Sequence, residues 1–182
     1  MLWEDVAAAE EKPPVRHPNR DLPESQTARL GVLALLAITI FMLVVVALGG
    51  WATLVGAKAL HIGFIVMYGI FAGYVYRWNR GVLPVIAAMA VMLGVFALVA
   101  GPAWFARDKT GYTDPTLPDA VLGIITLSLI PVQMLLIVVA MWGFSQQWSV
   151  EEEIKPGEPG GPPLESATAP PPAPPANAAP AS

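Results

Sequence analysis

The sequence contains no cysteine and little charge, and both absences narrow the class of protein. Without cysteine, the chain has neither a disulfide framework nor a thiol nucleophile. Only 13% of its 182 residues are charged, whereas about a quarter of a soluble domain usually is. A formal net charge of −4 argues against nucleic acid as a partner. Because 55% of the residues are hydrophobic, the composition excludes a soluble enzyme and indicates a chain embedded in a lipid bilayer.

Charged residues are absent from four apolar stretches, which are residues 30–50, 59–76, 82–104 and 120–144. About 20 residues of helix cross a bilayer core that is about 30 Å thick. The stretches therefore predict four transmembrane helices, none of which shows the polar stripe of a soluble helix. Short connections make an up-down antiparallel four-helix bundle the expected fold of this all-α integral membrane protein. Residues 59–76 are the shortest and most polar span, so we expect them to insert least readily alone.

The basic residues are divided unevenly between the two sides of the predicted bundle. The N-terminal arm, the loop 77–81 and the C-terminal tail share one side, which carries Lys12, Arg16, Arg20, Arg29, Arg77, Arg80 and Lys155. The other side carries only Lys58, Arg107 and Lys109. Since cytoplasmic loops carry the excess of Lys and Arg, both termini are predicted to be cytoplasmic. High Ala and Pro usage with only four lysines is typical of a GC-rich prokaryotic gene and favours a bacterial inner membrane.

We expect three parts along the chain. Residues 1–29 form a polar cytoplasmic arm, residues 30–144 the transmembrane domain, and residues 145–182 a disordered cytoplasmic tail rich in Pro and Ala. Ten of the nineteen prolines lie in 156–182, so this segment cannot bury enough apolar surface to fold and is predicted to be disordered. The tail is either a passive solvated segment or a ligand for a proline-binding partner. The loop 105–119 is either simply solvated or a docking surface that uses Arg107, Asp108, Lys109 and Tyr112.

Two kinds of residue mark where the predicted helices end and where they touch. Indole rings favour the level of the lipid headgroups, and four tryptophans fall at predicted span ends as interface anchors: Trp51, Trp78, Trp104 and Trp142. Small residues four positions apart let helix backbones approach closely. Two such pairs occur in the spans, Gly69 with Gly73 and Ala90 with Gly94. They predict tight helix packing, either within this chain or with another membrane protein.

Groups that could carry chemistry are scarce within the spans. No Asp, Glu, Lys or Arg lies at mid-membrane depth, which argues against a proton relay and against an intramembrane hydrolase. We therefore predict that the protein is not an enzyme. His61 is the single candidate for binding a cofactor, but the other histidine, His17, lies in the cytoplasmic arm. The sequence thus predicts neither a metal site nor a bound cofactor.

Polar residues and a proline mark the interior of the last span. Pro131 predicts a helix kink that frees the carbonyl of Leu127, which Thr126 or Ser128 could satisfy. Gln133 lies two residues further on. It either bonds to a neighbouring helix or lines a small polar site, for instance for a quinone headgroup.

Three functions fit these features. The favoured one is an accessory or structural subunit of a larger membrane protein complex, without catalytic residues. The second is a small transporter or channel that forms by oligomerisation and is lined by Thr39, Ser128 and Gln133. The third is a cofactor- or quinone-binding membrane protein that uses His61. The expected partners are the lipid bilayer and either other membrane subunits or further copies of the chain.

Overall fold

A computed structural model describes residues 15–107, 115–155 and 159, which fall into two compact units. One unit, His17–Val150, holds all the long helices. The described part of the other unit contains two short antiparallel strands, β1 (Val15–Arg16) and β2 (Glu152–Glu153). This pairing is not indicated by the composition of the tails. Disorder and partner binding, as predicted for 156–182, fall almost wholly outside the described residues.

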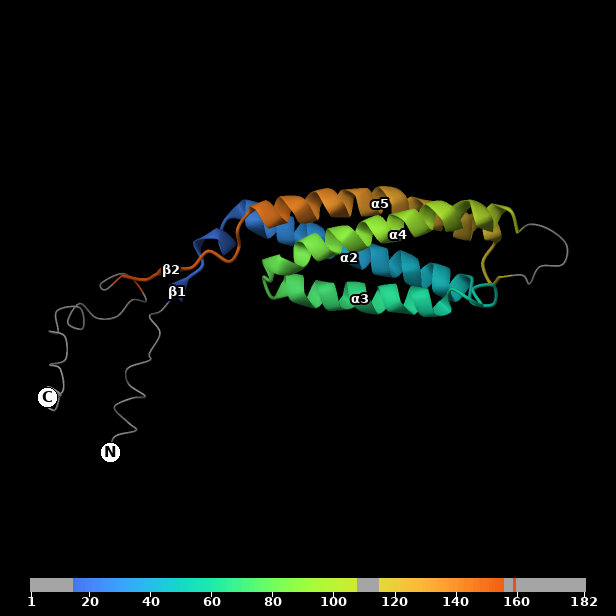
Figure 1. Cartoon of the computed structure of the whole chain (residues 1–182), viewed down its shortest axis with the longest axis horizontal. Helices are drawn as coiled ribbons and strands as arrows, with labels where there is room; N and C mark the ends of the chain where they lie inside the picture. The colour runs from blue at the N-terminus through green and yellow to red at the C-terminus, as the bar shows by residue number, and fades with distance from the viewer. Residues whose placement is uncertain (1–14, 108–114, 156–158, 160–182) are drawn as a thin grey trace, which may run out of the picture. The chain divides into compact units, whose positions relative to one another are not determined.

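Four long apolar helices form a bundle, as predicted (Figure 1): α2 (Pro23–Gly49), α3 (Lys58–Tyr76), α4 (Leu83–Phe105) and α5 (Asp119–Ser145). Each is long and apolar enough to cross a membrane, and α3 has the lowest mean hydropathy of the four. The main difference from the predicted spans is that α2 begins at Pro23, seven residues before the apolar stretch 30–50. Pro23 at the first helical turn and Glu24 beside it favour a helix start there, which hydropathy alone does not register.

The helices pack in a different order from their order in the chain. The most extensive contact joins α4 to α5, while α2 contacts both α5 and α3. The short connections predict consecutive helices as neighbours, and this contact is the least extensive for α3 and α4, although only a short turn and η3 (Arg80–Val82) separate them. Bulky rings contribute to the contact between these two helices. Phe64 on α3 meets Phe96 on α4 edge to face, with ring centroids 5.9 Å apart.

Small residues allow the close contact between α4 and α5. At spacings of three and four they line the inward side of α4: Ala87, Ala90, Gly94, Ala97 and Gly101. A Cβ on Gly94 would lie 3.9 Å from Cβ of Gln133 on α5. The packing of Ala90 and Gly94 is therefore internal to the bundle. By contrast, no atom of the described chain lies within 4 Å of a Cβ placed on Gly69 or Gly73, so no helix of this chain packs there.

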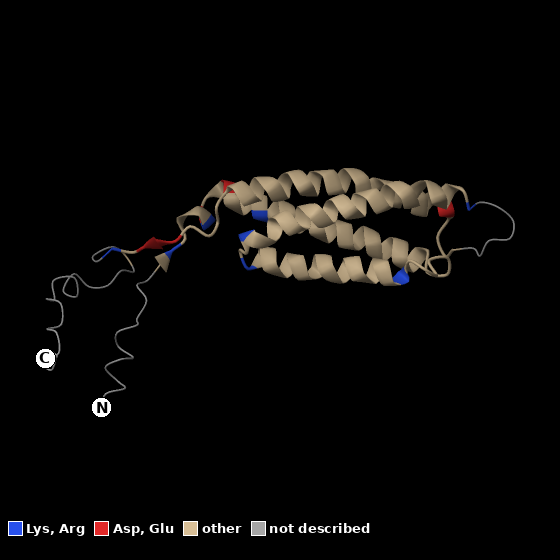
Figure 2. Ribbon diagram, viewed as in Figure 1, with Lys and Arg blue, Asp and Glu red and all other residues tan. Residues whose placement is uncertain are grey.

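The outer surface of the bundle is apolar on every helix. Large side chains that are more than half exposed include Phe41, Val66, Val99 and Val138, one from each helix. Within the described residues, Lys, Arg, Asp and Glu lie near the helix ends and in the segments beyond them (Figure 2). An apolar surface this large would make a protein aggregate in water, whereas it matches lipid chains. These features indicate a multi-pass membrane protein.

The four predicted tryptophan anchors divide into two kinds. Trp51 and Trp142 are exposed at helix ends, as anchoring requires. Trp104 is a correction, because its side chain is only 4% exposed and packs over Gly50, where a Cβ would lie 2.6 Å from Cη2 of the ring. Trp78 is half-buried and packs edge to face on Trp148, which is itself fully buried. The rings of Trp104 and Trp78 therefore pack against other parts of this chain at the helix ends.

The backbone of α5 continues as α-helix through Pro131. Neither hydroxyl near the proline turns to the carbonyl of Leu127. Thr126 Oγ1 donates to Leu122 O at 2.7 Å, and Ser128 Oγ donates to Ile124 O at 2.8 Å. A hydroxyl in a helix most easily reaches the carbonyl four residues back, and that residue is not Leu127 in either case.

Candidate functional site

A chain of hydrogen bonds connects three helices in the interior of the bundle. Tyr68 Oη on α3 donates to Gln133 Oε1 on α5 at 2.9 Å. Gln133 Nε2 then donates to Thr39 Oγ1 on α2 at 3.0 Å, and Thr39 Oγ1 donates to Leu35 O at 2.8 Å. All three side chains are buried. Gln133 on α5 therefore connects α2 and α3 in the interior of the bundle.

This arrangement favours a bridging role for Gln133 over a ligand site. Its carboxamide oxygen accepts from one helix and its nitrogen donates to another, so both ends are used. Hydrogen bonds between membrane helices average about 0.6 kcal/mol each. Two of them contribute only about 1 kcal/mol to the free energy of folding.

The three polar residues proposed to line a shared pore are not brought together. Thr39 and Gln133 face each other inside the bundle. Ser128 is exposed, and its hydroxyl is bonded to its own helix. The residue that joins Thr39 and Gln133 is instead Tyr68. The spacing of Phe64, Tyr68 and Phe71 on one side of α3 is the sequence signal that could have identified it.

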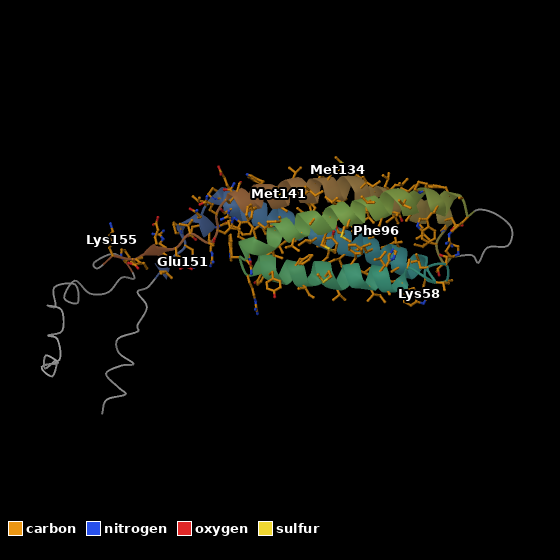
Figure 3. All side chains as sticks on the ribbon, in the orientation of Figure 1. Lys58, Phe96, Met134, Met141, Glu151 and Lys155 are labelled. Atoms are coloured by element: carbon orange, nitrogen blue, oxygen red, sulfur yellow. The ribbon has the colours of Figure 1, made fainter. Side chains whose placement is uncertain are left out.

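An apolar groove of about 320 Å³ opens where α3 and α4 stand apart. Apolar side chains from all four helices line it, among them Leu43, Phe64, Phe96, Trp104 and Leu129. Phe96 is labelled in Figure 3, on α4 beside α3. The polar side chains in its wall are His61, Arg107 and Thr126. The groove therefore has the apolar walls and few polar groups that are typical of sites for small amphipathic ligands.

Hydrogen bonding limits what the polar groups of the groove can do. His61 Nδ1 lies 3.1 Å from Ala57 O. Because a carbonyl oxygen only accepts, Nδ1 donates this hydrogen bond, and Nε2 is the ring nitrogen left to contact a ligand. The Thr126 hydroxyl is already used within α5. The guanidinium of Arg107 lies 5.4 Å from the centroid of the Trp104 ring and supplies donors and positive charge.

Residues 108–114 of the proposed docking loop lie outside the described residues, which leaves the predictions for Asp108, Lys109 and Tyr112 without a structural counterpart. Within the described ranges, no three His, Cys, Asp or Glu side chains are grouped as metal ligands.

Comparison with protein-family models, with curated proteins and with solved structures finds no match for this chain.

Proposed function

We propose that this protein is an accessory or structural subunit of a larger membrane protein complex. The observation that supports this function is an unoccupied face of α3, made of Ile62, Val66, Gly69 and Gly73, which we call the glycine face. Ile62 and Val66 are each about half exposed, and no described atom lies within 4 Å of a Cβ on either glycine. Small residues of this kind let a second helix approach the backbone closely.

Within the described residues, the small size of Gly69 and Gly73 serves no contact. A glycine within a helix costs about 1 kcal/mol relative to alanine, and nothing in the described fold requires its small size here. Close packing against a helix of another subunit offsets that cost. In addition, α3 is held chiefly by α2, so much of its surface remains available.

Replacing both Gly69 and Gly73 with Leu is expected to remove the partner subunits without unfolding the chain. Bulky side chains block the approach of another helix, and the space around both positions is open. The protein is purified in mild detergent from its own membrane, and proteins recovered in fixed stoichiometry are identified by mass spectrometry. Wild-type protein is expected to retain such subunits and the double variant to lose most of them.

Gly63→Leu is the matched control. This glycine also has no described atom within 4 Å, but it lies about 120° around the helix from Gly69. The control is expected to keep the partners. Equal recovery from all three proteins, or a homogeneous homo-oligomer that conducts ions in liposomes, would contradict the proposed function.

We further propose that the bundle end carrying Arg20, Arg77 and Arg80 lies in the cytoplasm, in a bacterial inner membrane. The start of α2, the turn between α3 and α4, and the end of α5 meet at this end (Figure 1). Its excess of basic residues supports the orientation.

The groove supports a second candidate function, which is binding of a quinone. His61 Nε2 can accept a hydrogen bond from a quinol hydroxyl, and Arg107 can donate to a quinone carbonyl. The volume of about 320 Å³ suits one aromatic headgroup.

A short-chain benzoquinone is expected to quench the fluorescence of Trp104 in a saturable manner. His61→Ala is expected to weaken this binding by about tenfold, because one hydrogen bond in an apolar site is lost. His17→Ala is the control, since His17 is not among the residues that line the groove and its Nδ1 lies 3.3 Å from Val150 O. Quenching that does not saturate, or that is equal in wild type and His61→Ala, would exclude this function.

A further inference from the structure

Three arginines surround a pocket at the bundle end opposite the groove. Arg20 belongs to η2 (Pro18–Arg20), Arg77 follows α3, and Arg80 begins η3. They line a pocket of about 530 Å³ together with Trp78, Asn79, Gly81, Phe144 and Ser149. No Asp or Glu is among these lining residues. The described lining of the pocket therefore concentrates positive charge.

Local backbone structure places two of these arginines beside each other. The helix α3 ends where Trp78 adopts a left-handed conformation, with φ of 61°, and Asn79 N donates to Tyr74 O at 3.0 Å. The chain then turns, and the Asn79 side chain accepts a hydrogen bond from Gly81 N at 3.0 Å. Arg77 and Arg80 thus flank one tight turn.

Backbone carbonyls hold two of the guanidinium groups in place. Arg80 Nε donates to Phe144 O at 2.7 Å, in the last turn of α5, and its Cζ lies 4.2 Å from the centroid of the Phe144 ring. Arg20 Nε donates to Trp148 O at 3.2 Å. These are the only hydrogen bonds that the two side chains make within the described part of the chain. The terminal nitrogens of both groups remain available as donors.

We propose that this pocket binds the headgroup of an anionic phospholipid. The planar fork of an arginine matches a phosphate, to which it donates two parallel hydrogen bonds. The pocket lies where the apolar helices end, which is the level of the headgroups, and the adjoining turns of α4 and α5 carry large exposed apolar side chains such as Val85 and Trp142. A phospholipid supplies the phosphate and the acyl chains together, whereas a soluble phosphate uses only the arginines.

Arg77→Gln tests the proposal. Arg77 is exposed, and its side chain forms no hydrogen bond within the described residues, so its replacement is expected to leave the fold intact. The purified full-length protein is titrated with phosphatidylglycerol or with phosphatidylcholine of the same acyl chains, and bound lipid is measured by native mass spectrometry. Wild-type protein is expected to bind phosphatidylglycerol several-fold more tightly. Arg77→Gln is expected to reduce that affinity about fivefold and to leave phosphatidylcholine binding unchanged.

Lys58→Gln is the matched control, because it removes the same charge at the other end of the bundle (Figure 3). It is expected to keep the preference for phosphatidylglycerol. Arg20→Gln provides a second variant within the pocket and is expected to act in the same direction as Arg77→Gln. Equal affinity of the wild type for the two lipids, or equal losses in Lys58→Gln and Arg77→Gln, would overturn the proposal. Displacement of phosphatidylglycerol by equimolar inorganic phosphate would also overturn it and assign the pocket to a soluble anion.

Discussion

Replacing Trp148 with Ala is expected to lower the free energy of unfolding by about 3–5 kcal/mol, which is typical when a buried tryptophan is removed from a core. Trp148 is fully buried, although it lies beyond the last transmembrane helix. Its ring packs edge to face on Trp78, with centroids 5.4 Å apart, and covers Gly143 of α5. Its carbonyl also accepts the hydrogen bond from Arg20. The substitution therefore opens a cavity among three chain segments that meet at this end.

Two other variants separate packing from lipid anchoring. Trp142→Ala is the matched control, because Trp142 is 41% exposed, and we expect it to cost less than about 1 kcal/mol. Trp148→Phe is expected to cost less than Trp148→Ala, since most of the ring volume is kept and the indole N–H has no partner within the described structure. Unfolding is followed by near-ultraviolet circular dichroism in detergent. A Trp148→Ala variant as stable as Trp142→Ala would show that Trp148 is not part of the folded core.

The contact between α4 and α5 gives the second large effect. Gly101→Ala is expected to destabilise the bundle by about 1–3 kcal/mol, because the added Cβ would lie 2.6 Å from Leu127 Cγ. To remove this steric clash, either Leu127 must adopt a new conformation or α4 and α5 must move apart. Since α4 and α5 form the most extensive contact in the bundle, the loss of stability should be readily measurable.

Gly94→Ala is the matched comparison on the same side of α4. Here a Cβ would meet only Gln133 Cβ, at an ordinary distance of 3.9 Å. The variant is expected to be as stable as the wild type, or more stable by up to about 1 kcal/mol because alanine favours a helix. Thermal unfolding of both variants in the same detergent measures the difference. If Gly94→Ala were the more damaging substitution, the arrangement of α4 on α5 described above would be wrong.

Pairs of small residues with the same spacing have different surroundings in this fold. Ala90 and Gly94 pack against α5, whereas Gly69 and Gly73 face outward, although both pairs have the same spacing in an apolar helix. Trp51 and Trp104 likewise both lie at predicted helix ends, yet only Trp51 is exposed. Spacing identifies residues that could mediate contact. It does not say which of them meets this chain and which meets lipid or another subunit.

The candidate sites show the same limit. His61 could be singled out as the only histidine within a predicted span, but the groove beside it is lined by side chains from all four helices. Gln133 could be recognised as a bridging residue, but its partners Tyr68 and Thr39 are 65 and 94 residues away in the sequence. The arginine pocket likewise joins Arg77 and Arg80, on one turn, with Arg20 from η2, more than 50 residues earlier in the chain. Only the packing of the helices brings these groups together.

The amino-acid sequence by itself determined where the chain leaves water, because moving charged and apolar groups between water and lipid changes the free energy by large amounts. Those changes set the four spans and confined the charged side chains to their ends. Only the tertiary structure decided which side of each helix turns inward. Lipid and protein interior are similarly apolar, so hydropathy does not distinguish the two sides. Shape complementarity, such as Gly101 beneath Leu127, and the few interhelical hydrogen bonds made that choice.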